Sequence, residues 1–186
     1  MLSDRVRELI EKSRIVSFDW QYPTAVIDIF QQADDERRFL TDEEIDKIKT
    51  IIPSLSEGLA QGKALRDNVN DIISSAREVV LNTYPHLTEK GGGLYPPMRA
   101  EACWRDFWHF MRCISYGVSG KALNYTSEIG LSYMEQLYQE LQVPLNAMVL
   151  GLEQLKVFGL QKFEPSQRQD LEPYFDRLIE SMSHFI

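Results

Sequence analysis

The chain has 186 residues, the size of a single domain, and 44% of them are hydrophobic, which is enough to bury a continuous core. Its formal net charge of −8 argues against a nucleic-acid-binding protein, because phosphate binding needs clustered Lys and Arg and the 20 basic residues are scattered among 28 acidic ones. No run of about 18 apolar residues and no secretory signal pattern occurs, so we expect a soluble, cytoplasmic protein without a transmembrane segment.

Hydrophobic periodicity predicts helices through the N-terminal half of the chain. A short amphipathic helix is expected over residues 3–16 and a second over residues 24–38, each with apolar residues at helical spacing on one face. Thr41 and Glu44 have the spacing of a capping box, in which each side chain accepts the backbone N–H of the other residue, and they predict the start of the next helix. Apolar spacing over residues 55–83 predicts one or two packed helices.

The clearest break in the chain separates these helices from a central one. Three consecutive glycines and several prolines lie within residues 84–97, and they predict a loop because neither residue type continues a helix. The next helix, 98–118, is apolar around most of its circumference, so we expect other helices or a ligand to pack on several of its sides. Further helices are predicted over residues 127–141, 144–158 and 166–185. The predicted fold class is therefore all-α.

The chain has two cysteines, Cys103 and Cys113, ten residues apart. On one helix they lie roughly 15 Å apart, which is too far for a disulfide. We therefore expect a reducing compartment. Cys113 is interpreted as a small buried hydrophobic residue without a role in the site.

The central predicted helix carries a thiol, a cation and an anion close together, at Cys103, Arg105 and Asp106. Helical spacing places Cys103 and Asp106 on one face, whereas Arg105 lies roughly 200° around the helix from the thiol. An elongated ligand lying across the helix would contact all three side chains. By itself the pattern is weak, because Arg105 and Asp106 also fit a surface ion pair that contributes little free energy.

Four stretches around these residues match a known pattern with gapless spacing. They are Gly91-Gly92-Gly93-Leu94-Tyr95, Arg99-Ala100-Glu101-Ala102-Cys103-Trp104-Arg105-Asp106, Phe110-Met111-Arg112 and Ser115-Tyr116-Gly117. Together they resemble the bilin-attachment segment of allophycocyanin and its relatives in the phycobiliprotein superfamily, and a thinner similarity extends over residues 24 to 182. The resemblance implies a globin-like bilin-binding domain over residues 23–186, with residues 1–22 as an N-terminal helical extension.

The resemblance implies that the site holds a linear tetrapyrrole, phycocyanobilin or a related bilin. In this family the cysteine at the position of Cys103 forms a thioether to ring A of the pigment, the arginine at that of Arg105 pairs with a propionate, and the aspartate at that of Asp106 accepts pyrrole N–H groups. These roles agree with side-chain chemistry. A guanidinium meets a carboxylate in a bidentate pair, and a nearby carboxylate favours a protonated pigment.

Five further positions are candidate contacts of the pigment. Arg99 matches a basic position near a propionate, Tyr95 matches a position beside the pocket, and His109 replaces a tyrosine that usually faces the chromophore. Trp104 and Phe107 are expected to restrict rotation of the pigment rings, although such aromatic residues more often belong to a hydrophobic core. Without the resemblance, His109 is a candidate haem ligand, but a partly buried helix histidine is commoner.

Departures from the family pattern leave three hypotheses open. Segment 1–22 precedes the usual start of the family, where it would cover or replace the surface through which antenna subunits pair, and Ser119-Gly120-Lys121 stands in place of Ala-Gly-Asp. These departures favour a bilin carrier of the kind associated with bilin biosynthesis. The alternatives are a light-harvesting, allophycocyanin-like phycobilisome subunit at the thylakoid surface and a pigment-free helical interaction protein. The expected partners are a bilin and either a second copy of the chain or a phycobiliprotein-like subunit.

An enzyme is the least supported interpretation of the sequence. Cys103 and His109 lie six residues apart on the central helix, on different faces, so they cannot form a nucleophile and base pair directly. We therefore expect no catalytic residues, and no metal ligands are assigned.

Overall fold

The computed structural model describes residues 3–186, and helices form almost all of its regular structure. The helices are α1 (Asp4–Lys12), α2 (Thr24–Asp35), α3 (Asp42–Ile51), α4 (Ser56–Asp67), α5 (Val69–Thr83), α6 (Pro97–Ser119), α7 (Glu128–Glu140), α8 (Leu145–Leu160) and α9 (Pro165–Ser183). A short 3-10 turn, Pro53–Leu55, precedes α4. The all-α fold class predicted from the sequence is confirmed, and none of these helices combines the length and apolarity needed to cross a lipid bilayer.

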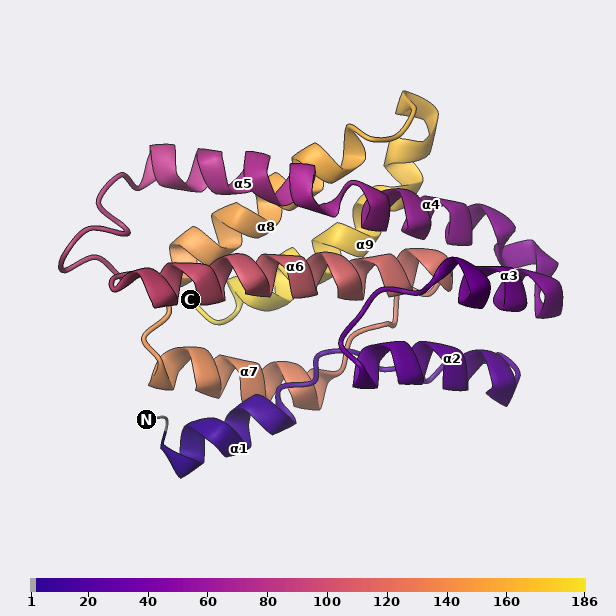
Figure 1. Cartoon of the computed structure of the whole chain (residues 1–186), viewed down its shortest axis with the longest axis horizontal. Coiled ribbons are helices and arrows are strands. Elements are labelled where there is room, and N and C mark those ends of the chain that lie inside the picture. The colour runs from indigo at the N-terminus through magenta and orange to yellow at the C-terminus, as the bar shows by residue number, and fades with distance from the viewer. Residues whose placement is uncertain (1–2) are drawn as a thin grey trace.

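Helix α6 runs through the centre of the molecule. In Figure 1, α4 and α5 lie along one side of it, α1, α2 and α7 lie along the other, and α8 and α9 cross behind it. Every residue from Phe110 to Gly120 is buried, as expected of a helix that is apolar around most of its circumference. The loop over residues 84–96 leads into the first turn of α6. The N-terminal half of α6 is less covered than the C-terminal half, and it carries the candidate site.

Local sequence signals begin and end the helices near the predicted positions. The capping box is present, because the backbone N–H of Glu44 donates to Thr41 Oγ1 at 3.2 Å and that of Thr41 donates to Glu44 Oε2 at 2.9 Å. Residues 55–83 form two helices rather than one. The break falls at Asn68, whose side-chain amide donates to the carbonyl of Ala64 at 2.8 Å and thereby competes with continuation of α4.

The N-terminal segment folds back onto its own chain. Helix α1 packs on α7, and the backbone N–H of Ser127 donates to the carbonyl of Ile15 at 2.8 Å. A Cβ atom at Gly130 would collide with the carbonyl oxygen of Arg14, so only glycine allows the two backbones to approach this closely. The start of α7 is therefore covered by residues 14 and 15.

A buried ion pair holds α2 against α6. Arg112 Nη1 lies 2.6 Å from Asp34 Oδ1, and both side chains are only 7% exposed. Arg14 also donates to Asp34 at 3.0 Å, and Arg112 donates to Tyr116 Oη at 2.9 Å. Phe30 packs edge-on against the ring of Tyr116. Because each buried charge has a partner, α2 docks on α6 without an uncompensated ion.

Candidate functional site

Cys103 lies on α6 where that helix faces α8. Its side chain is 5% exposed, and its Sγ atom lies 3.0 Å from the sulfur of Met148 on α8. Burial raises the pKa of the Cys103 thiol well above its usual range, and the nearby charge of Asp106 acts in the same direction. At neutral pH the thiol is therefore protonated and covered by a flexible methionine side chain.

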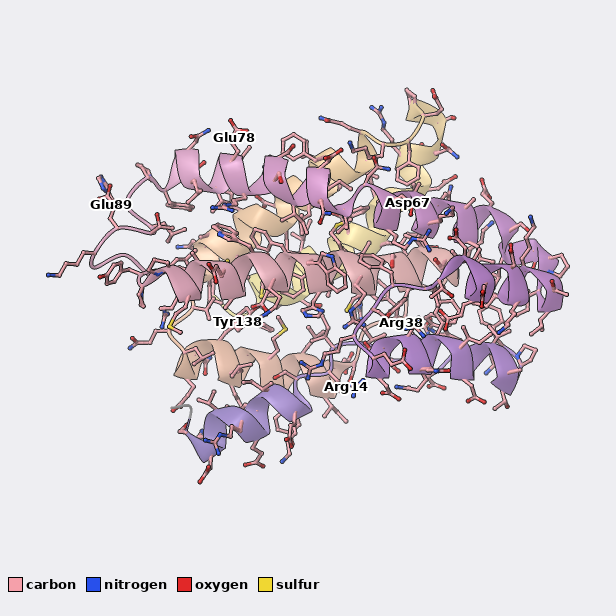
Figure 2. The ribbon with its side chains drawn as sticks, viewed as in Figure 1. Arg14, Arg38, Asp67, Glu78, Glu89 and Tyr138 are labelled. Carbon is pink, nitrogen blue, oxygen red and sulfur yellow. The ribbon has the colours of Figure 1, made fainter. Side chains whose placement is uncertain are left out.

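Asp106 lies one turn after Cys103 on the same helix and is half-buried. The hydroxyl of Tyr138, on α7, donates to Asp106 Oδ2 at 2.8 Å. Tyr138 lies between α6 and α7 in Figure 2. Burial raises the pKa of Asp106 to about 6, against the opposing effects of the Tyr138 hydrogen bond and the charge of Arg105.

Tyr138 was not predicted as a site residue. A tyrosine among apolar residues on a helix is normally interpreted as part of the core, and no local pattern links position 138 to position 106. Only the packing of α7 on α6 brings the hydroxyl to the carboxylate.

The Arg105 side chain is exposed on α6. Within residues 3–186 its guanidinium forms no hydrogen bond or ion pair, so the surface pair with Asp106 does not form. Its charge nevertheless acts on the carboxyl group of Asp106 through space. The guanidinium is therefore available to a ligand.

Arg99 lies in the first turn of α6, near the end of α7, and Tyr95 lies on the loop that precedes α6. The Arg99 guanidinium donates to the carbonyl of Gly93 at 3.0 Å, to that of Leu141 at 2.7 Å and to that of Gln142 at 3.0 Å. It thereby ties the loop before α6 to the end of α7. Tyr95 is 45% exposed on that loop.

The two aromatic candidates differ in their surroundings. Phe107 is fully buried against Gly151, where a Cβ atom would collide with its ring. Trp104 is nearly buried, and the guanidinium of Arg77 lies over its ring at 5.2 Å from the centroid. The indole Nε1 of Trp104 is buried and has no hydrogen-bond partner within the described chain. Such an orphaned donor costs free energy unless an acceptor reaches it.

His109 is half-buried next to the ion pair that holds α2. Its Nδ1 atom accepts a hydrogen bond from Arg112 Nε at 3.3 Å. Burial lowers the pKa of His109 to about 4, and the positive charges of Arg112, Arg37 and Arg105 act in the same direction. The imidazole is therefore neutral at physiological pH.

The chemistry of this cluster fits an elongated ligand that has carboxylates, N–H donors and carbonyl oxygens. Arg105 offers a guanidinium, Asp106 a carboxylate, Trp104 an unpaired N–H and Cys103 a thiol, all on neighbouring turns of α6. Access to the thiol requires the Met148 side chain to move, and access to the carboxylate requires the Tyr138 hydroxyl to move. The donor set of these residues fits such a ligand, and each of the two groups is covered by a side chain with rotatable bonds.

The helical fold and the polar cluster on its central helix define an all-helical, globin-like protein with one candidate binding site. A family model described as "Phycobilisome protein" matches residues 28–182. The chain is 27% identical over 158 residues to the allophycocyanin alpha-B chain of Cyanophora paradoxa, covering 85% of this chain and 98% of the relative. It is 30% identical over 153 residues to the allophycocyanin alpha-B chain of Cyanidium caldarium, covering 82% and 94%. The chain belongs to the phycobilisome protein family, as the sequence resemblance predicted.

Proposed function

We propose that the chain binds a linear tetrapyrrole along the N-terminal half of α6. Cys103 would attach the pigment by a thioether, Asp106 would accept its pyrrole N–H groups, and Arg105 would pair with a propionate. The observation that carries this proposal is the exposed Arg105 guanidinium without a partner, one residue from a half-buried carboxylate. The relatives named as allophycocyanin chains support it.

The chain's own residues would prepare the pigment for absorption of visible light, which is the chemistry that a conjugated bilin supplies. Asp106 is held beside α7 by Tyr138, and a carboxylate there favours a cationic, protonated pigment. Phe107 and Trp104 make a rigid wall on α6, because Phe107 is locked against α8 and Trp104 packs on Phe107 with ring centroids 5.5 Å apart. A rigid wall restricts twisting of pigment rings against it.

Covalent attachment is tested by co-expressing the chain with haem oxygenase and a bilin reductase. We expect a blue or green protein whose pigment stays on the denatured chain and fluoresces in the presence of zinc. Cys103→Ser should release all pigment on denaturation. The matched control, Cys113→Ser, should retain it, because Cys113 is packed inside α6's buried half.

Two outcomes would contradict the proposal. A denatured wild-type chain without zinc-dependent fluorescence would rule out the thioether. A native protein that stays colourless after exposure to bilin would rule out pigment binding and would favour the pigment-free interaction protein.

We further propose that the protein is a bilin carrier outside the antenna. Support comes from the N-terminal extension, where α1 packs on α7 and residues 14 and 15 cover the start of α7. These contacts use the chain's own extension to cover a face of α7. The family resemblance assigns subunit pairing in antenna proteins to this region.

The antenna hypothesis is favoured by a different observation, the names of the relatives. The relatives described above are named as allophycocyanin chains. Molar mass and emission separate the two roles. We expect the pigmented protein to be a monomer or homodimer with weak emission by light scattering and fluorescence quantum yield. A strongly fluorescent trimer or larger ring, formed on mixing with an allophycocyanin beta subunit, would instead identify an antenna subunit.

A further inference from the structure

Two arginines of the described chain lack any partner. The side chains of Arg37 and Arg105 are exposed and make no hydrogen bond, ion pair or ring contact within residues 3–186. The other arginines in that range each donate to an acceptor or stack on an aromatic ring. A guanidinium presents five N–H donors in a fixed fork, so two unpaired ones are a candidate site for an anion.

Both arginines lie around His109. Arg105, His109 and Arg112 are spaced by four and three residues along α6, so they form one stripe on its surface. Arg112 pairs with Asp34 at the end of α2. The backbone N–H of Arg37 donates to the carbonyl of Asp34 at 2.9 Å, which brings Arg37 to the same stripe.

The backbone holds Arg37 in an unusual conformation. Its φ angle is 54°, in the left-handed region that a residue with a long side chain rarely adopts. The end of α2 accounts for it, because the backbone N–H of Arg38 donates to the carbonyl of Ala33 at 3.0 Å and that of Arg37 to the carbonyl of Asp34 at 2.9 Å, the two bonds of a left-handed helix cap. This cap fixes the backbone from which the Arg37 side chain starts.

Acidic residues near Arg37 are already neutralised. Asp34 is paired with Arg112, Asp35 accepts from Arg14 at 2.7 Å, and Glu36 pairs with Arg38. None of these carboxylates pairs with Arg37 within the described chain. The Arg37 guanidinium is therefore left without a carboxylate partner within the described chain, on a protein whose net charge is −8.

His109 adds a neutral donor to this site. Because Arg112 donates to Nδ1, the neutral ring must carry its proton on Nε2. The positive charges of Arg37 and Arg105 both act on the ring and lower the pKa of His109. Arg37, His109 and Arg105 thus offer N–H donors near the junction of α2 and α6, and the two guanidinium groups have no acceptor within the described chain.

We propose that Arg37, His109 and Arg105 together bind a propionate carboxylate of the pigment, so that the end of α2 forms part of the pigment site. This inference rests on the proposed bilin binding. It assigns a role to Arg37, which does not belong to the group of candidate residues on α6. It also makes pigment affinity depend on the docking of α2 on α6.

The test uses full-length protein with Cys103→Ser, so that pigment binding is reversible. Free-acid bilin and its dimethyl ester, which lacks the carboxylates, are each titrated by absorbance. Adding Arg37→Gln should weaken binding of the free acid about tenfold, the effect of one charge-assisted hydrogen bond, and leave binding of the ester unchanged. The matched control, Arg7→Gln on α1, should change neither affinity, because the partner of Arg7 within residues 3–186 is the exposed Asp4.

Each result separates the inference from the proposed function. If Arg37→Gln leaves free-acid affinity unchanged, or weakens the ester equally, Arg37 does not bind a propionate and the rest of the proposed site stands. If the parent protein binds neither compound, bilin binding itself fails, and the role of Arg37 fails with it. Circular dichroism of each variant shows whether the fold is intact before titration.

Discussion

Replacing Asp34 by alanine should lower the free energy of unfolding by about 3–5 kcal/mol, because it leaves the buried guanidinium of Arg112 without its carboxylate. The pair is almost completely buried and its shortest N–O distance is 2.6 Å. An unpaired Arg112 guanidinium in this buried position loses its hydration and gains no opposite charge in return. Urea unfolding followed by circular dichroism measures the loss.

The control for this prediction is an exposed pair of the same kind. Asp4→Ala removes the partner of Arg7 in a pair whose Asp4 side chain is 99% exposed, and it should cost less than about 1 kcal/mol. Combining Asp34→Leu with Arg112→Met should restore much of the stability, because no unpaired ion remains. A loss below about 1 kcal/mol for Asp34→Ala would mean that Asp34 and Arg112 do not form a buried pair between α2 and α6.

The second large effect is expected from Asp106→Asn in the pigment-free protein. The pKa of Asp106 is raised from 3.8 to about 6, so the folded state binds its proton more tightly than the unfolded state. Stability from this group is therefore fully present below about pH 4 and is lost as pH rises through about 6. A shift of this size corresponds to at most about 3 kcal/mol, less what solvent screening removes at a half-buried group. Asp106→Asn should remove that loss, so the variant gains stability relative to wild type as pH rises to about 8.

His109 has the opposite effect in the same pH interval. Its pKa is lowered from 6.5 to about 4, so the unfolded state binds its proton more tightly and stability rises with pH between those values. The two contributions partly cancel, and the wild-type stability profile should be nearly flat there. In Asp106→Asn, the free energy of unfolding should rise with pH because only the contribution of His109 remains. In His109→Gln, it should fall with pH because only the contribution of Asp106 remains.

Urea unfolding at several pH values between about 4 and 8 measures these slopes. The variant Asp28→Asn, at an exposed position on α2, serves as the control and should leave the wild-type profile unchanged. If Asp106→Asn is no more stable than wild type near pH 8, the Asp106 carboxylate is not buried as described. In the pigmented protein the same substitution should weaken long-wavelength absorbance, because the counter-charge of the protonated pigment is lost. A carboxylate that costs stability without ligand is typical of a binding site.

The periodicity of the sequence determined the helices and the central place of α6. Spacing of apolar residues is a local property, and the capping box at Thr41 depends only on residues three apart. The candidate residues on α6 could likewise be found from sequence, because Cys103, Arg105 and Asp106 lie on adjacent turns of one helix. Their grouping needs no information about other helices.

Only the tertiary structure decided which groups cover and complete that site. Met148 covers the thiol from α8, Tyr138 reaches the carboxylate from α7, and Asp34 at the end of α2 pairs with Arg112, the neighbour of His109. The predicted helix over residues 3–16 also ends earlier, at Lys12, and Ile15 instead accepts a hydrogen bond from the start of α7. These contacts join residues far apart in the chain, and they depend on how whole helix faces pack, so no local spacing in the sequence contains them.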